Sequence, residues 1–265
     1  MITEITSTQN PRVKNLALLL SKSKVRKERR SFLIEGKREI ERALKTGWTM
    51  LELWSTSESW LRRSKARPVG GMVLTNEAVF QKLAYRSGVV DTVAVFEMPD
   101  TTPKDWSVAL ANHPAVLVLE GIEKPGNLGA VMRSAVAAGI KAIILADSRV
   151  DPFNPNVVRN ATGALFELAV YHASSAELLE ILPGLGYAVY TTKLGADSSD
   201  VFATEYSSRS AFVFGTEAHG LTPLWDSPEV HNILIPMYSA TVDSLNISVS
   251  AAVVAFDWSR KFHGK

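Results

Sequence analysis

The sequence predicts an α/β protein with two domains, and three observations support this fold class. Apolar runs typical of buried strands alternate with stretches of helical periodicity along the chain. This alternation is interrupted once, by a segment that contains prolines and polar residues. The apolar runs after the interruption are continuous, which is typical of a parallel sheet covered on both faces. We therefore predict a front domain over residues 1–97, a linker over 98–113 and a rear domain over 114–265.

The front domain is predicted to alternate strands with helices. Short apolar runs predict strands at 31–34, 51–54, 73–74 and 93–96. Leucines at helical spacing predict a first helix over 10–22. Start and stop signals predict further helices over 36–46, ended by Gly47, and from Thr75 to Leu83. The segment 21–30 is rich in Lys and Arg and is expected to form a basic turn.

The rear domain repeats this pattern. Apolar runs predict six strands, at 115–119, 142–145, 166–171, 187–190, 211–214 and 232–235. Helices are predicted over 129–138, 176–182 and 244–260. Gly139 ends the first of these, and the Pro183-Gly184 pair ends the second.

The composition limits the classes of function that this protein can have. With 265 residues, 46% of them hydrophobic, the chain is long enough for a substantial core. The absence of cysteine excludes disulfides, thiolate zinc sites and a thiol nucleophile. The five histidines do not have the spacing of metal ligands, so we expect no metal site. No signal sequence or membrane-spanning apolar run is found, and we predict a cytoplasmic protein without membrane contact.

The net charge of +2 hides an asymmetry. Residues 1–45 hold 12 Lys and Arg against 5 Asp and Glu, whereas the other residues are net acidic. A basic front end on a nearly neutral protein indicates a nucleic-acid partner, and a solvated helix face is the alternative interpretation. The candidate RNA-binding residues are Arg12, Lys14, Lys22, Lys24, Arg26, Lys27, Arg29 and Arg30.

Two common nucleotide-binding motifs are absent. No G-x-G-x-x-G follows a predicted strand, and no G-x-x-x-x-G-K-[ST] occurs anywhere. A cofactor pocket in this chain must therefore be built from other loops at strand ends.

Three segments resemble the signature motifs of the SpoU/TrmH family of RNA ribose 2′-O-methyltransferases, and their order and spacing also match. The first corresponds to N-x-G-x-x-x-R and contains Asn127, Gly129 and Arg133. The second, G-x-E-x-x-G-L, contains Gly215, Glu217, Gly220 and Leu221. The third joins I-P-M to S-L-N, with Ile235, Pro236, Met237, Ser244, Leu245 and Asn246. Asn10-Pro11 and the run 32–36 also resemble the ribosomal-protein-like substrate-binding domain of this family.

The resemblance implies a rear domain with a C-terminal trefoil knot that holds S-adenosylmethionine, and a homodimer. Methylation of ribosomal RNA is the expected activity. A transfer-RNA substrate is the first alternative, a non-catalytic RNA-binding protein with the same fold the second, and an oxidoreductase a distant third. The implied cofactor-binding residues are Thr191, Thr192, Leu194, Phe214, Gly215, Thr216, Glu217, Gly220, Leu221, Ile235, Pro236, Met237, Ser244, Leu245 and Asn246.

The implied catalytic residues are Arg133, Asn127, Glu217, Ser244 and Asn246. The guanidinium of Arg133 is a poor base at neutral pH, so binding a phosphate and stabilising the developing alkoxide is its expected role. Asn127 and Ser244 have an alternative role as helix caps, and Glu217 has one in stabilising a turn.

Overall fold

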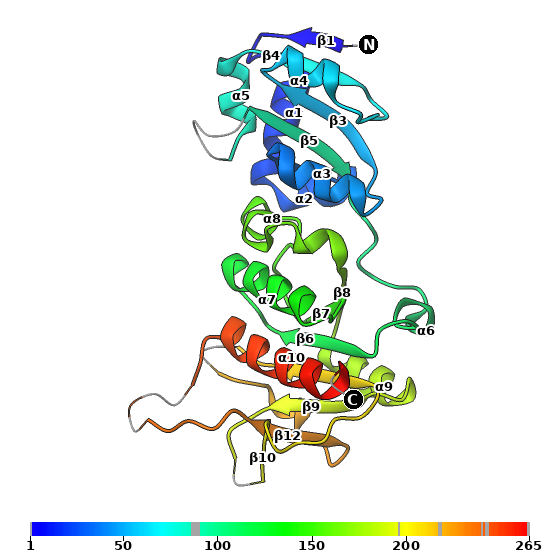
Figure 1. Cartoon of the computed structure of the whole chain (residues 1–265), viewed down its shortest axis with the longest axis vertical. Coiled ribbons are helices and arrows are strands. Elements are labelled where there is room, and N and C mark those ends of the chain that lie inside the picture. Colours follow the sequence, from blue (N-terminus) through cyan, green and yellow to red (C-terminus); the bar gives the residue numbers. More distant parts are fainter. Residues whose placement is uncertain are drawn as a thin grey trace. The chain divides into compact units, whose positions relative to one another are not determined.

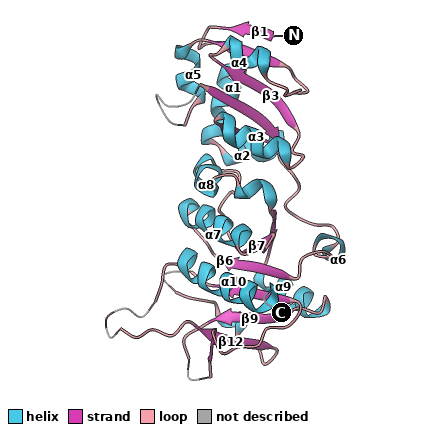
Figure 2. Ribbon diagram, viewed as in Figure 1, coloured by secondary structure: helices cyan, strands magenta, loops and turns pink. Residues whose placement is uncertain are grey.

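A computed structural model describes residues 2–85, 91–195, 197–216, 219–239, 241 and 244–263 (Figure 1). The chain divides into two compact units. The front unit joins Met1–Pro99 to Asp151–Phe166, and the rear unit joins Asp100–Val150 to Glu167–Lys265. Both units combine helices with strands, so the predicted α/β class is confirmed (Figure 2).

The front unit contains a mixed five-stranded sheet in the order β1-β4-β3-β5-β2. Strand β5 is antiparallel to β2 and β3, while β1 and β3 are both parallel to β4. The strands are β1 (Ile2–Ile5), β2 (Ser31–Glu35), β3 (Met50–Ser55), β4 (Met72–Thr75) and β5 (Thr92–Glu97). The helices are α1 (Pro11–Ser21), α2 (Ser23–Arg29), α3 (Lys37–Lys45), α4 (Glu58–Arg63), α5 (Glu77–Leu83) and α8 (Pro155–Ala161).

The four predicted front strands and the three predicted front helices are all found. Local signals explain their ends: Asn10 accepts a hydrogen bond from the Arg12 amide at the start of α1, and Asn76 caps α5. The predicted basic turn over 21–30 is wrong, because most of it forms α2. This helix ends at Arg29, because the left-handed backbone of Arg30 (φ 47°) stops it.

The segment 151–166 lies in the predicted rear domain, yet it packs with the front unit. Its Asp151 forms a buried ion pair with Arg26 of α2, at 2.7 Å. The indole of Trp48 donates to the Phe166 carbonyl at 3.1 Å and meets the Phe166 ring edge-on. The predicted rear domain over 114–265 includes this segment, which the structure groups with the front unit. The predicted strand over 166–171 starts later, because residues Ala164–Glu167 form a 3₁₀ turn.

The rear unit contains a seven-stranded sheet in the order β10-β12-β9-β11-β6-β7-β8, and every pairing in it is parallel. The predicted parallel sheet is confirmed. The strands are β6 (Ala115–Glu120), β7 (Ala142–Ala146), β8 (Ala169–Ala173), β9 (Ala188–Thr192), β10 (Ser199–Asp200), β11 (Ser210–Phe214) and β12 (Val230–Leu234).

Helices cover this sheet. Helix α9 (Ser175–Gly184) and the 3₁₀ turn η2 (Pro223–Trp225) pack on Val118 and Val213 from one side. Helices α7 (Pro125–Ala137) and α10 (Ile247–His263) pack on each other, and α10 also contacts β11. A short helix, α6 (Trp106–Ala109), lies within the predicted linker. None of the helices in the described ranges is long and apolar enough to cross a membrane.

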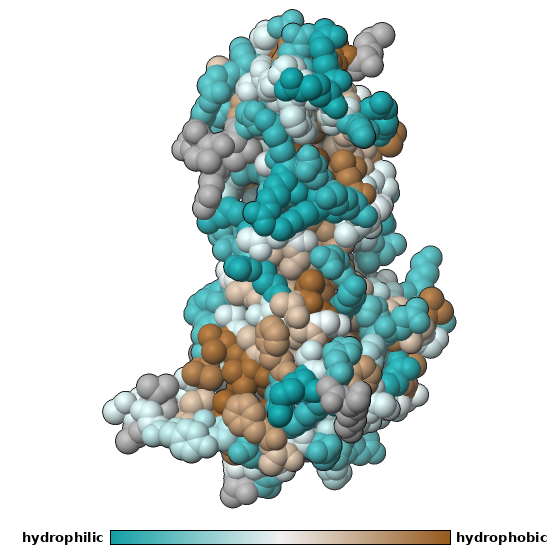
Figure 3. Space-filling model, in the orientation of Figure 1, coloured by the Kyte–Doolittle hydropathy of each residue, from teal (hydrophilic) through white to brown (hydrophobic). Residues whose placement is uncertain are grey.

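The starts of α7 and α10 differ most from their predicted positions. Helix α7 begins at Pro125, one turn before the predicted Gly129, because proline is well suited to the first position of a helix. Helix α10 begins at Ile247 rather than Ser244. Part of α10 is open to solvent, with Val249, Phe256 and Phe262 exposed by 46%, 51% and 39%. In Figure 3, hydrophobic side chains gather on the rear unit in the region of α10.

Candidate functional site

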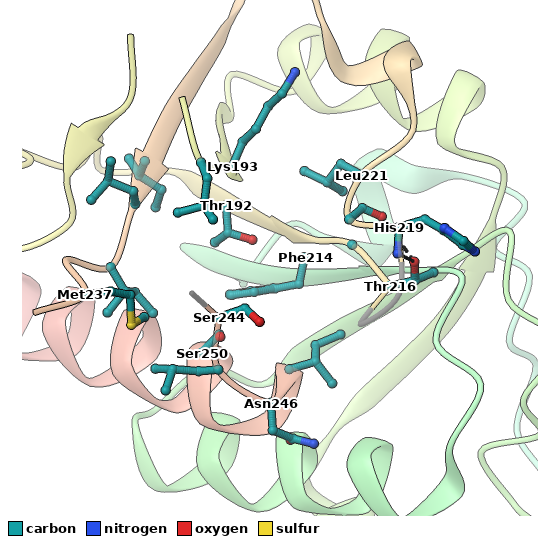
Figure 4. A pocket seen from close by; sticks show the side chains of 18 residues that line it. Thr192, Lys193, Phe214, Thr216, His219, Leu221, Met237, Ser244, Asn246 and Ser250 are labelled. Atoms are coloured by element: carbon teal, nitrogen blue, oxygen red, sulfur yellow. Dashed lines mark hydrogen bonds between the residues drawn. The ribbon is translucent and has the colours of Figure 1, made fainter. Parts of the chain in front are cut away.

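A cavity of about 610 Å³ lies at the carboxyl ends of β9, β11 and β12. This is where parallel α/β sheets commonly bind ligands, and the volume suits a drug-sized cofactor. In Figure 4 the side chains surround one space, with Leu221 and His219 on the side opposite Met237. The lining combines apolar side chains with hydroxyl and amide groups, and so suits a ligand that has both apolar and polar parts.

The loop after β11 requires glycine at one crossing point. A Cβ atom on Gly215 would lie 2.1 Å from the carbonyl carbon of Gly220, so no larger residue fits there. Thr216 and Gly220 exchange two backbone hydrogen bonds, of 2.9 and 3.0 Å, which close the loop on itself. Gly220 has a φ of 66°, a conformation that glycine adopts at little cost. The two glycines therefore bring the backbone of this loop to the cavity.

Most of the predicted cofactor-binding residues line this cavity. They are Thr192, Leu194, Phe214, Gly215, Thr216, Gly220, Leu221, Ile235, Met237, Ser244, Leu245 and Asn246. Two others are not among the described lining residues. Thr191 is fully buried and its hydroxyl donates to Asn232 Oδ1 at 2.7 Å, because its side chain points to the neighbouring strand. Pro236 lies between two lining residues without lining the cavity itself. Glu217 lies outside the described residues.

Six further lining residues were not predicted: Lys193, His219, Ile233, Leu234, Ile247 and Ser250. Lys193 lies between the predicted residues Thr192 and Leu194, and His219 directly precedes Gly220, but neither occupies a motif position. Ser250 lies four residues after Asn246, a spacing that places both on one face of a helix start. Lys193 forms an ion pair with Asp226, so its charge is balanced within the protein.

Asn246 joins the cavity to helix α7. Its Oδ1 accepts hydrogen bonds from the amide and the hydroxyl of Ser248, at 2.9 and 2.7 Å, and so caps α10. Its Nδ2 donates to Oδ1 of Asn127 in the first turn of α7, at 3.3 Å. The alternative role of Ser244 as helix cap is therefore wrong. Asn127 is the third residue of α7 and does not cap it either.

Arg133 lies on α7 and is exposed. It is not among the described residues that line the cavity of its own chain. The predicted catalytic residues are thus only partly brought together. Asn127, Ser244 and Asn246 lie at or beside the cavity, while Arg133 lies about two turns beyond Asn127 on α7.

Six of the eight predicted RNA-binding residues are exposed on and around α1 and α2: Lys14, Lys22, Lys24, Lys27, Arg29 and Arg30. Arg12 is half-buried, with a 3.0 Å ion pair to Glu52 and its guanidinium over the Trp54 ring. Arg26 contradicts the prediction, because its side chain is only 2% exposed and pairs with Asp151. A buried, neutralised guanidinium is not available to phosphate. Among the described residues, no three His, Cys, Asp or Glu side chains are placed to hold a metal ion.

The fold and the site define an α/β protein with a mixed apolar and polar cavity at the ends of parallel strands. The chain belongs to the SpoU rRNA Methylase family, which matches residues 114–256. Residues 10–94 match the MRM3-like substrate binding domain. The predicted family and enzyme class, an RNA 2′-O-methyltransferase, are therefore confirmed.

Individual relatives are similar over nearly their full length. The 23S rRNA (guanosine(2553)-2′-O)-methyltransferase RlmP of Bacillus subtilis is 29% identical, over 96% of this chain and 98% of its own. A crystal structure of an RNA 2′-O ribose methyltransferase is 36% identical, with a TM-score of 0.80 over 98% of this chain and 99% of its own. The AdoMet-bound rRNA methyltransferase from Sinorhizobium meliloti is 30% identical, with a TM-score of 0.85 over 98% of both chains.

Proposed function

We propose that this protein transfers a methyl group from S-adenosylmethionine to the 2′-hydroxyl of a ribose in ribosomal RNA. The observation that carries the proposal is the cavity, which the predicted cofactor residues line at the strand ends. Similarity to rRNA methyltransferases over nearly the whole chain, front domain included, supports the ribosomal substrate. A transfer-RNA substrate is the alternative.

The residues of the cavity fit S-adenosylmethionine. Leu221, Met237 and Leu245 offer apolar walls for a neutral adenine ring, and the loop at Gly215 and Gly220 brings backbone groups close. When bound, the cofactor supplies a methyl group activated by its sulfonium charge. The protein then has to align the ribose hydroxyl and assist the loss of its proton.

Arg133 supplies the positive charge for RNA. As an exposed guanidinium it can bind a phosphate in bidentate fashion and stabilise a developing alkoxide, while water or another group accepts the proton. Asn127 and Asn246 orient this helix relative to the cavity through their hydrogen bond. The exposed cations of α1 and α2 are the proposed grip on the phosphate backbone.

A homodimer is the proposed assembly. Three exposed apolar side chains on α10 (Val249, Phe256 and Phe262) offer a surface for a second copy of the chain. In such a dimer, Arg133 of one protomer can serve the cavity of its partner. The trefoil knot stays a prediction.

Two measurements test the proposed function. Calorimetry should detect binding of S-adenosylmethionine to the full chain. Labelled methyl groups should then appear on ribose 2′-oxygens of ribosomal RNA when protein and cofactor are incubated with it. Transfer to transfer RNA alone would favour the alternative substrate, and cofactor binding without transfer to either RNA would favour a non-catalytic protein.

A further inference from the structure

A carboxylate outside the sequence motifs lies behind the cavity. Glu120 is the last residue of β6 and is only 3% exposed. Its oxygens accept four hydrogen bonds, from Ser175 Oγ at 2.8 Å, the Thr222 amide at 2.9 Å, Thr222 Oγ1 at 2.8 Å and Trp225 Nε1 at 2.9 Å. Burial of a carboxylate is costly unless donors compensate it, and these donors do so. Its side chain therefore has a fixed place in the rear unit.

Three of the four donors belong to one loop. Thr222 follows Leu221, which lines the cavity, and Trp225 ends the 3₁₀ turn just beyond. The fourth donor, Ser175, is the first residue of α9 and does not line the described cavity. Glu120 thus joins a cavity loop to the sheet and to a helix behind it.

The residue after Glu120 lies close to the start of the same loop. Gly121 has a φ of 59°, and a Cβ atom there would lie 2.8 Å from Cγ2 of Thr216. Thr216 is itself a lining residue. The pair Glu120-Gly121 therefore contacts the loop at its start, through Thr216, and at its end, through Thr222.

We propose that Glu120 is a positioning residue for the cofactor: it holds Thr222, and with it the cavity-lining residue Leu221, in the place that binds S-adenosylmethionine. This inference rests on the proposed function, because it names the residue that shapes the same cavity. Glu120 acts through Thr222 and Trp225 and does not itself line the described cavity.

A matched pair of substitutions separates this role from a general structural one. Thr222→Val and Ser175→Ala each remove one hydroxyl that donates to Oε1 of Glu120 at 2.8 Å, the first from the loop and the second from α9. Glu120→Gln keeps the size of the side chain but turns one acceptor oxygen into a donor. The readouts are the Kd for S-adenosylmethionine by calorimetry, the KM and kcat for methyl transfer, and Tm.

Thr222→Val is expected to raise the Kd and the KM for S-adenosylmethionine about tenfold, the effect of losing one hydrogen bond to a charged group. Its kcat at saturating cofactor should stay within about threefold of wild type, since the reacting groups are untouched. Ser175→Ala should lower Tm about as much as Thr222→Val does. It should nevertheless leave the Kd for S-adenosylmethionine within about twofold of wild type. Glu120→Gln should lose more cofactor affinity than Thr222→Val. If Glu120→Gln fails to fold, Thr222→Val still tests the proposal.

Equal effects of Thr222→Val and Ser175→Ala on the Kd would overturn the positioning role, as would wild-type affinity in folded Glu120→Gln. A wild-type protein that does not bind S-adenosylmethionine at all would instead refute the proposed function. The two failures are therefore distinguishable in one series of titrations.

Discussion

The side-chain amide of Asn246 donates to Oδ1 of Asn127, joining the cavity wall to the first turn of α7. These two residues come from motifs more than one hundred positions apart in the sequence. Arg133 follows Asn127 on the same helix. This hydrogen bond therefore connects the cofactor side of the site to the proposed substrate side.

Asn246→Asp tests this connection. Aspartate retains the oxygen that caps α10 at Ser248 but cannot donate to Asn127. We expect a Tm near that of wild type and a clear drop in kcat. In a double-mutant cycle with Asn127→Ala, the two effects should be non-additive by roughly 0.5–3 kcal/mol. Full additivity would show that the hydrogen bond carries no coupling.

Arg133→Ala should abolish most methyl transfer and leave the Kd for S-adenosylmethionine within a few-fold of wild type. The reason is that Arg133 is exposed and absent from the described cavity lining. Lys141→Ala is the control, since this exposed cation directly precedes β7, at the amino end of a strand, whereas the cavity lies at carboxyl ends. Near-normal turnover by Arg133→Ala would remove its catalytic assignment.

Binding of the full chain to RNA should weaken steeply with salt. Each neutralised phosphate contributes about −0.7 to −0.9 to the slope of log affinity against log salt. Reversing the charge of Lys14, Lys24, Lys27 and Arg29 should flatten this slope and leave cofactor binding unchanged, because all four are exposed on the front unit. An unchanged slope would favour the alternative interpretation, in which these cations form a solvated surface and do not bind RNA.

Arg26→Ala should act on stability rather than on phosphate contacts. It removes one partner of the buried pair with Asp151 and leaves that carboxylate unpaired, at a cost of roughly 3–5 kcal/mol. Lys27→Ala, its exposed neighbour, should change the free energy of unfolding by less than about 0.5 kcal/mol. Chemical denaturation measures both, and similar values would contradict the buried pair.

Asp257 on α10 makes the stability of the folded protein depend on pH. Burial works against its ionised form, but hydrogen bonds from Lys261 and Arg260 outweigh this and hold its pKa below the ordinary 3.8. A lowered folded pKa stabilises the protein above the unfolded pKa, and this contribution is lost as pH falls through the folded value. Asp257→Asn should therefore lower Tm at pH 7 by roughly 5 °C. The difference from wild type should shrink as pH falls below about 4, and a constant difference would contradict this.

The sequence was most informative where local patterns decide structure. Continuous apolar runs predicted the parallel sheet, and the strand-end motifs predicted most of the cavity. Long-range pairing was not predictable. The charge of Arg26 resembled that of its neighbours, and its buried partner carboxylate, Asp151, lies 125 positions away. The role of Glu120 depends in the same way on residues 55 to 105 positions later. The first residue of α10 was also predicted wrongly. Serine and asparagine both favour the cap position, so the sequence did not distinguish Ser244 from Asn246 as the cap.

The central claim is that this protein methylates a ribose 2′-oxygen in ribosomal RNA. Mass-spectrometric mapping of 2′-O-methyl groups, in RNA from cells with and without the protein, tests it most directly. The account predicts one ribosomal nucleotide that carries the modification only when the protein is present and loses it with Arg133→Ala. Identical ribosomal maps from the two kinds of cell, under conditions in which the protein is made, would contradict it.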